Sequence, residues 1–337
     1  MTTATSDELL EIRRAVRELC DRFPGEYWRS LEPDRYPEEF VRALTEHGWL
    51  AALIPEEYRG AGLGLTAASV ILEEVNASGG NAAACHAQMY TMGTLLRHGS
   101  EEQKQRYLPR IAAGRLRLQA FGVTEPTVGS DTTRIQTSAR RVGGGYVIRG
   151  QKIWTSRALY SDLMLLLART TPFEEVERKS DGISVFLIDM KAAGERLTIR
   201  PVATMMNHAT TEVFLDDVEV PADALVGEEG EGFRYILDGM NAERILLAAE
   251  CIGDGRWFVD KAVRYASERV VFELLASEAP WQAANVCLDT HGGFGFAREY
   301  DVERKFRETR LYSVAPVSNN LVLAYLGQHV LGLPRSY

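Results

Sequence analysis

The chain has 337 residues, of which 45% are hydrophobic, and a formal net charge of −9. This length and apolar content suffice for large buried cores and fit two or three domains. The acidic balance argues against a nucleic-acid partner, because the phosphate backbone would be repelled rather than neutralised.

The sequence also limits compartment and metal binding. The longest apolar run, residues 163–168, is too short to span a bilayer, and the N-terminus resembles neither a signal peptide nor a transit peptide. We therefore expect a cytoplasmic protein without a membrane segment. The four cysteines and six histidines are scattered and show no C-x-x-C spacing. They are interpreted as structural residues, and no metal site is predicted.

Residues 1–114 are predicted to form an all-helical domain. Apolar residues recur at helical spacing from residue 6 to about residue 114, apart from a Gly- and Pro-rich loop at 54–65. Within this region Ser100 precedes Gln103 by three positions, which is the pattern of a helix N-cap with a reciprocating side chain.

Residues 115–228 change to a β pattern. Six short runs of strand-forming residues are separated by turn residues, with no segment of helical length between them. This order favours a small antiparallel barrel or sandwich over a βαβ fold. A Rossmann fold is also disfavoured, because no strand is followed by G-x-G-x-x-G.

Two segments inside this β region carry the strongest functional signal. The first, QAFGVTEPTVGSD at 119–131, runs from an apolar strand into a turn where Thr124, Gly129 and Ser130 leave backbone N–H groups free for a pyrophosphate. The second, YVIRGQKIWTSRA at 146–158, is a strand that ends in aromatic and hydroxyl side chains.

The end of the second segment suits a flat cofactor with a polar rim. Trp154 can stack on a ring system, while Thr155 and Ser156 can hydrogen-bond its edge, which is the combination that a flavin needs. Each segment alone is more often an ordinary turn or a core aromatic. Their occurrence together is what favours a flavin site.

From residue 229 to 337 the helical period returns. An apolar stripe that includes Met240 continues to Glu243 three positions later, so this carboxylate is expected to be partly desolvated. Desolvation raises the pKa of a carboxylate and makes it a better base for a carbon-bound proton. From position alone, pairing of Glu243 with a neighbouring helix is the more ordinary interpretation, because buried structural ion pairs also perturb pKa values. Asn241 and Arg244 lie three positions apart on an adjacent face, where they could bind one ligand together.

Taken together, these segments resemble the acyl-CoA dehydrogenase family. The resemblance extends over nearly the whole chain, through residues 48–64, 99–114, 210–221, 227–233 and 289–312. It implies an α+β multidomain fold with an N-terminal helical domain at 1–114, a middle antiparallel β-barrel at 115–228 and a C-terminal helical bundle at 229–337.

The resemblance also implies which residue is the base. Most members carry the catalytic glutamate in a Tyr-Glu-Gly-Thr segment, but the matching stretch here, residues 315–318, has Pro316 in that place. Isovaleryl-CoA and long-chain members instead carry it in a D-x-E-R-like motif, which matches residues 241–244. Glu243 is therefore the predicted base, with Asn241 and Arg244 on the pantetheine arm. Because proline has no N–H, either another amide binds the thioester carbonyl or that site is weaker.

For the cofactor, the resemblance implies FAD. The positions that match the family's flavin contacts are Phe121, Val123, Thr124, Ser130, Trp154, Thr155 and Ser156, and Ser130 also matches a contact to the CoA arm. The adenosine end is held by a neighbouring subunit in the family, at positions that match Arg269, Phe272, Gly292, Gly293, Ser318 and Asn320. Asp289 stands where glutamine is usual, and its charge disfavours a pyrophosphate contact. These matches imply a homodimer or homotetramer.

The resemblance is interrupted between Phe272 and Glu273, where a turn and more than one helix of the family are missing. From Lys261 to Ala279 no residue favours a turn, so one continuous helix broken near Pro280 is predicted. Three explanations remain open: a segment absent from this sequence, a genuine deletion, or a hetero-oligomer whose partner supplies the missing helices.

The implied function is FAD-dependent dehydrogenation of an acyl-CoA, or an acyl carrier protein thioester, to the trans-2-enoyl product. The resemblance places such an enzyme in fatty acid metabolism, with an electron-transferring flavoprotein as its partner. Two alternatives remain: a flavin monooxygenase or oxidase on the same fold, and a non-catalytic subunit of a hetero-oligomeric dehydrogenase.

Overall fold

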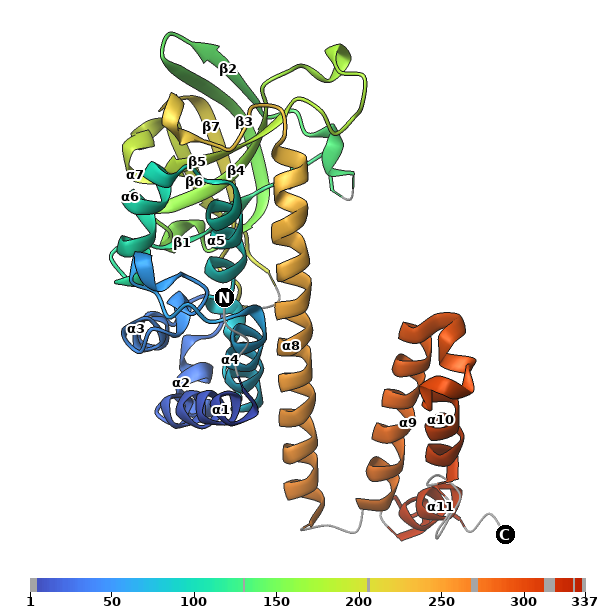
Figure 1. The fold of residues 1–337 in the computed structure, drawn as a ribbon. Coiled ribbons are helices and arrows are strands. Elements are labelled where there is room, and N and C mark those ends of the chain that lie inside the picture. The colour runs from blue at the N-terminus through green and yellow to red at the C-terminus, as the bar shows by residue number, and fades with distance from the viewer. Residues whose placement is uncertain are drawn as a thin grey trace. The chain divides into compact units, whose positions relative to one another are not determined.

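The computed structural model describes residues 5–129, 131–204, 207–267, 272–311, 319–329 and 331–334. It divides into two compact units, Met1–Gly255 and Arg256–Tyr337, which are described separately below (Figure 1). The first unit contains the N-terminal helices, the sheet and the first part of α8. The second contains the remaining described helices.

Six α-helices form the N-terminal layer of the first unit. They are α1 (Ser6–Cys20), α2 (Gly25–Leu31), α3 (Glu38–Glu46), α4 (Leu65–Ala77), α5 (Ala87–His98) and α6 (Glu101–Ala112). The predicted cap of α6 is confirmed: the Gln103 N–H donates to Ser100 Oγ at 3.2 Å, and the Ser100 N–H donates to Gln103 Oε1 at 2.9 Å. This reciprocal pair fixes where α6 begins.

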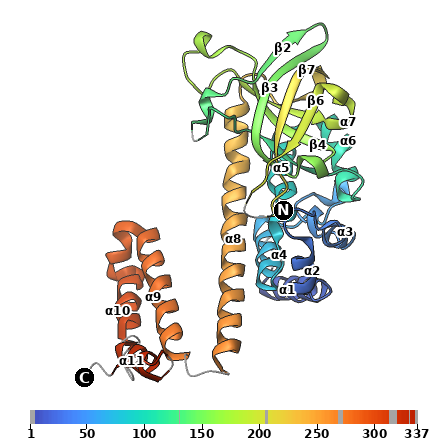
Figure 2. The same cartoon turned by 180° about the vertical axis from the view of Figure 1, so that it is seen from behind.

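An eight-stranded sheet follows the helices. Its strands are β1 (Leu118–Gly122), β2 (Ser138–Val142), β3 (Gly145–Ser156), β4 (Leu163–Arg169), β5 (Ile183–Asp189), β6 (Leu197–Pro201), β7 (Thr210–Pro221) and β8 (Leu225–Val226). The strand order is β6-β7-β3-β2-β4-β5-β8, with β1 pairing in parallel to β4. Figure 2 shows β6, β7 and β3 of this sheet side by side.

The three-part fold is confirmed, but the expected closed barrel is wrong for the described strands. The sheet is open, with β6 as one of its edges. Arg200 and Pro201 at the end of β6 are exposed, and proline has no N–H to offer to a further strand. Two pairings of β4, with β1 and with β2, are parallel rather than antiparallel. The sheet is therefore mixed.

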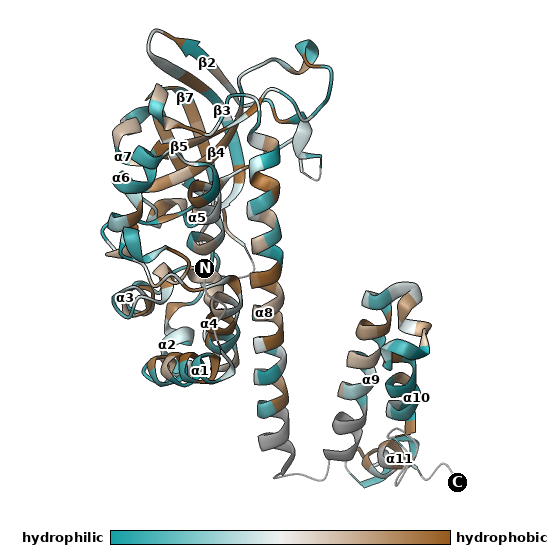
Figure 3. Cartoon of the chain, viewed as in Figure 1, coloured by the Kyte–Doolittle hydropathy of each residue, from teal (hydrophilic) through white to brown (hydrophobic). Residues whose placement is uncertain are grey.

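The strand β4 joins two hydrophobic cores. All seven of its residues are buried, and hydrophobic residues are concentrated there (Figure 3). Leu163, Leu165 and Leu167 pack with the helical layer, whereas Met164 and Leu166 pack on the other face of the sheet. Successive side chains of a strand point to opposite faces, so one strand holds both layers in register. Packing of β4 between the two cores holds the neighbouring strand β1 against α5.

Helix α8 (Gly232–Ser267) begins in the first unit, where Ile236 and Leu246 join the core of the helical layer. The second unit contains α9 (Phe272–His291), α10 (Val302–Arg310) and α11 (Asn319–His329). The expected helix break at Pro280 is wrong, because this proline lies inside α9. Proline removes one backbone hydrogen bond but need not end a helix that is held by packing. Here Trp281 packs on Phe306 of α10, with ring centroids 4.7 Å apart. The residues between α8 and α9 lie outside the described part.

Candidate active site

A cavity of about 640 Å³ lies in the first unit between the helical layer, the sheet and α8. Six of the residues predicted to contact flavin or substrate line it: Phe121, Val123, Thr124, Trp154, Ser156 and Glu243. They come from the end of β1 and the loop after it, from the end of β3, and from α8. The fold therefore brings together segments that are far apart in the sequence.

A backbone contact joins the two flavin-type segments. The Ile153 N–H donates to the Thr124 carbonyl at 2.9 Å, so the loop after β1 is tied to the end of β3. The pairing of β3 with β7 is irregular between Lys152 and Thr155, and Trp154 has a φ of 59°. This left-handed conformation is unfavourable for a bulky residue and persists where the surrounding structure enforces it. It leaves the indole 57% exposed on the cavity wall.

A buried ion pair, which was not predicted from the sequence, supports this junction. Lys152 and Glu125 are almost completely buried, and Nζ lies 2.8 Å from Oε1. Lys152 also donates to the Val123 carbonyl at 3.1 Å, and Glu125 accepts backbone N–H groups of Gln136 and Thr137. Burial lowers the pKa of Lys152 to about 8. The sequence feature that could have indicated this pair is a lysine at an inward-facing position of β3.

Several buried polar atoms around the cavity have no hydrogen-bond partner within the described structure. They are Gln119 Nε2, Thr155 Oγ1, Arg157 Nε and His208 Nδ1. Thr155 is 1% exposed and does not line the cavity, unlike its neighbour Ser156. An unsatisfied buried polar atom costs about 1–3 kcal/mol. The polar rim of a flavin, together with the exposed indole of Trp154, is a chemically suitable complement to this wall.

Glu243 lies on the α8 side of the cavity, between Met240 and Leu247, which line it one turn away on either side. Burial raises the pKa of the Glu243 carboxyl above its ordinary 4.5, while the positive charges of Arg157 and Arg244 act in the opposite direction. The carboxylate is half-buried rather than sealed. A base in this setting is both accessible to a ligand and stronger than an exposed glutamate.

The predicted pantetheine residues lie outside the cavity wall. Asn241 and Arg244 are exposed on α8, and Arg244 Nη1 donates to Asn241 Oδ1 at 3.1 Å. The predicted residues Ser130, Arg269 and Ser318, as well as Pro316, lie outside the described residues, and nothing is described of the Phe272 side chain.

Other predicted cofactor residues belong to the second unit. Gly292 and Gly293 begin a 3-10 turn at the end of α9, and Gly292 has a φ of 54°, which suits glycine. Asn320 is exposed in the first turn of α11, and Asp289 lies near the end of α9.

The other end of the cavity is polar, and its histidine was predicted from the sequence to be structural. His86 Nδ1 lies 2.7 Å from Glu250 Oε1, and both side chains are buried. Burial lowers the pKa of His86, which favours the neutral ring with its Nδ1–H donated to the carboxylate. Both residues line the same cavity as Glu243. Their distance along the sequence hid this pair.

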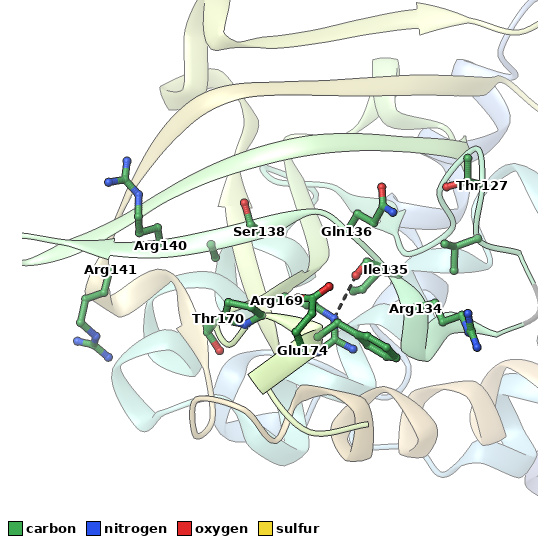
Figure 4. Close-up of a pocket in the computed structure, with 14 residues that line it drawn as sticks. Thr127, Arg134, Ile135, Gln136, Ser138, Arg140, Arg141, Arg169, Thr170 and Glu174 are labelled. Atoms are coloured by element: carbon green, nitrogen blue, oxygen red, sulfur yellow. Dashed lines mark hydrogen bonds between the residues drawn. The ribbon is translucent and has the colours of Figure 1, made fainter. Parts of the chain in front are cut away.

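A second hollow of about 790 Å³ lies on the sheet and is lined by Arg134, Arg140, Arg141 and Arg169 (Figure 4). Its arginines largely have partners of their own. Arg134 and Arg141 form ion pairs with nearby acidic residues, and Arg169 donates to backbone carbonyls, including that of Ile135 at 3.1 Å. None of the predicted site residues lines this hollow, so its larger volume does not make it the active site.

Family comparison gives the same three-part division. Residues 6–115 match the acyl-CoA dehydrogenase N-terminal domain, residues 120–218 the middle domain and residues 230–275 the C-terminal domain. The chain belongs to the acyl-CoA dehydrogenase family. It is thus an oxidoreductase of the acyl-CoA dehydrogenase type, in a family of flavoproteins that generally use FAD.

Individual relatives support this assignment. Acyl-CoA dehydrogenase FadE12 of Mycobacterium tuberculosis (strain ATCC 25618 / H37Rv) is 31% identical over 98% of both chains, and glutaryl-CoA dehydrogenase of Desulfococcus multivorans is 28% identical over 98% of both. Among solved structures, the glutaryl-coenzyme A dehydrogenase glutaryl-CoA complex matches with a TM-score of 0.73 at 24% identity, covering 100% of this chain and 98% of that one. This last similarity concerns the fold alone.

The match to FadE12 also bears on the interruption. It extends over 384 aligned positions although this chain has 337 residues, so the relative has residues without a counterpart here. The match to the C-terminal domain ends at residue 275, close to the predicted interruption between residues 272 and 273.

Among the described residues, no helix is long and apolar enough to cross a membrane, and no His, Cys, Asp or Glu cluster could hold a metal ion.

Proposed function

We propose that the protein uses FAD to dehydrogenate acyl-CoA thioesters to trans-2-enoyl-CoA, with Glu243 as the base. One observation carries this proposal: Glu243 and Trp154 line one cavity from opposite structural layers, α8 and β3. A flat cofactor against the indole and an acyl chain beside the carboxylate would share that space. An acyl carrier protein thioester would present the same reacting atoms.

The chain's own residues supply binding and proton transfer. Glu243 takes the α-proton of the thioester, and its raised pKa makes it a stronger base than an exposed carboxylate. Met240 and Leu247 give the acyl chain an apolar contact on either side of this carboxylate. FAD, when bound, would supply the hydride acceptor for the β-hydrogen.

The cofactor is proposed to lie against β1, β3 and their loops. The contacts would come from Phe121, Val123, Thr124, Ser130, Trp154, Thr155 and Ser156. A second subunit would hold the adenosine end through Arg269, Phe272, Gly292, Gly293, Ser318 and Asn320, which makes the protein at least a homodimer and fits a homotetramer. Ser130, Asn241 and Arg244 would hold the CoA arm.

The electron partner and the domain division remain part of this proposal. We propose an electron-transferring flavoprotein as the physiological oxidant, and domains at 1–114, 115–228 and 229–337 with a segment missing between residues 272 and 273. A genuine deletion would be revealed by weak flavin binding, measured as the flavin absorbance of the purified chain.

The test measures whether the electrons removed from the substrate pass to an artificial acceptor or to oxygen. The purified protein is reconstituted with FAD and given a series of acyl-CoA thioesters, and both reduction of an artificial electron acceptor and oxygen uptake are measured. We expect acceptor reduction with formation of the trans-2-enoyl thioester, and little oxygen uptake. Oxygen uptake without an enoyl product would instead show a monooxygenase or oxidase. A protein that binds FAD but reduces neither acceptor would be a non-catalytic subunit.

A further inference from the structure

The two ends of the cavity along α8 differ in exposure to solvent. Glu243 and Glu250 are seven residues apart and both line the cavity, so they lie on one face of the helix about 10 Å apart along its axis. Asn241 and Arg244, beside Glu243, are exposed, whereas Glu250 is 7% exposed and His86 is 5% exposed. The large polar CoA part of a bound thioester would extend into solvent at the exposed end, so the acyl tail would point toward the buried end.

That buried end is not the apolar floor that a simple alkyl tail needs. It is lined by His86 and Glu250, with Asn76 and Asp254 beside them. Asn76 is already occupied, because its Nδ2 donates to Asp254 Oδ1 at 3.1 Å and its Oδ1 accepts the Ala82 N–H at 3.0 Å. An alkyl tail placed here would bury polar groups without replacing their interactions with water.

The groups at this end without a partner in the described structure include two acceptors, besides Arg157 Nε–H and His208 Nδ1. With Nδ1–H of His86 donated to Glu250 Oε1, the ring presents Nε2 as an acceptor, and neither this atom nor Glu250 Oε2 has a hydrogen-bond partner in the part of the chain that the structure describes. A ligand that matches two acceptors must bring a donor, and on an acyl chain the simplest donor is a hydroxyl group.

Charge excludes an acidic tail. Glu243, Glu250 and Asp254 are three carboxyl groups on one side of the cavity, and Arg157 is the cation that lines it with them. Burial raises the pKa values of Glu243 and Asp254, which shows that further negative charge is already unfavourable there. A tail that ends in a carboxylate would add another anion to this group.

We propose that the substrates are acyl-CoA thioesters whose acyl chain carries a hydroxyl group, bound by the His86–Glu250 pair. An extended chain advances about 1.2 Å per bond, so the hydroxyl lies about eight bonds beyond the α-carbon held at Glu243. This inference rests on the proposed function, because it takes Glu243 as the group that contacts the α-carbon.

The test uses the reconstituted, FAD-loaded protein under anaerobic conditions. Decanoyl-CoA, ω-hydroxydecanoyl-CoA and the analogue of the same length with a terminal carboxylate are compared by the second-order rate constant for flavin bleaching. We expect the hydroxylated thioester to react about tenfold faster than the alkyl one, and the carboxylated one to be slowest. An alkyl or carboxylated thioester that reacts as fast overturns the inference but leaves the proposed function intact. If none of the three bleaches the flavin although another thioester of the series does, this inference alone is wrong. If no thioester of the series bleaches it, the proposed function is wrong as well.

Matched variants locate the effect. His86→Leu removes the acceptor, whereas His98→Leu changes the histidine at the other end of α5, which pairs with Asp238 and does not line the cavity. The ratio of the hydroxylated to the alkyl rate constant should fall toward one in H86L and stay at its wild-type value in H98L. An unchanged ratio in a folded, FAD-loaded H86L protein contradicts the assignment. If H86L does not fold, the three-thioester comparison on the wild-type protein still decides.

Discussion

Lys152 and Glu125 form a buried ion pair that ties the loop after β1 to the end of β3, directly behind the cavity wall. Nζ and Oε1 are 2.8 Å apart, and neither side chain is more than 4% exposed. Buried ion pairs contribute little net stability compared with apolar residues of the same shape, but losing one partner leaves an uncompensated charge. We interpret the pair as the support that sets the relative position of Thr124 and Trp154.

Removing one partner of this pair should therefore cost more than removing both. We expect Lys152→Met to lower the free energy of unfolding by about 3–5 kcal/mol, because Glu125 is left buried and unpaired. Lys152→Met combined with Glu125→Gln should recover part of that loss. Urea unfolding of the single and double variants measures both values. Additive losses would show that the two residues are not coupled.

Trp154 allows strain and cofactor stacking to be separated. Its φ of 59° is favourable for glycine but not for alanine. Trp154→Gly and Trp154→Ala should both bind FAD at least about tenfold more weakly, because both lose the indole. The glycine variant should be more stable than the alanine variant by about 1 kcal/mol. Titration of the apoprotein with FAD and thermal unfolding without FAD measure these effects. Equal stability of the two variants would mean that the left-handed conformation is absent.

Arg157 should set the pH range in which the base works. Its charge favours the ionised form of Glu243 and so opposes the rise in pKa that burial causes. Arg157→Gln should raise the pKa of Glu243 further and move the acidic limb of the rate of flavin reduction to higher pH. Arg244→Gln should cause a smaller change, because Arg244 is exposed and solvent screens its charge. A shift to lower pH in R157Q would contradict the assigned electrostatics.

Glu243 should also reduce stability near neutral pH. Its folded-state pKa is raised above 4.5, so between that value and the folded pKa the native state binds more protons than the unfolded state. Stability from this group is therefore lost as pH rises through the window. Glu243→Gln should gain stability relative to wild type on going from acidic to neutral pH, by about 1 kcal/mol given partial exposure. A constant difference in unfolding free energy across this range would argue against a desolvated carboxylate.

The sequence predicted those parts of the fold that depend on local patterns. The Ser100 cap, the helical layer and the switch to strands could all be read from spacing and propensity. The open sheet could not, because closure depends on long-range pairing: β6 would need a partner other than β7, and its exposed Arg200–Pro201 end gives no such partner. Pro280 inside α9 was also not predictable, because packing of Trp281 on Phe306 maintains the helix around it.

The same division applies to the site. Thr124, Trp154 and Glu243 lie in recognisable local segments, and the structure places all three on one cavity. His86 and Glu250 are 164 positions apart and carry no motif, so only tertiary structure brings them together. The Lys152–Glu125 pair was hidden for a similar reason, since burial of a charge is a property of the folded chain.

The central claim is that Glu243 removes the α-proton, and single-turnover flavin reduction tests it most directly. FAD-loaded wild type, Glu243→Gln and the exposed control Glu195→Gln are mixed anaerobically with a thioester that bleaches the wild-type flavin. We predict that E243Q binds FAD and thioester but reduces the flavin about 10³-fold more slowly, while E195Q matches wild type. If the flavin of FAD-loaded E243Q is reduced at the wild-type rate, another group accepts the proton, and this account is contradicted.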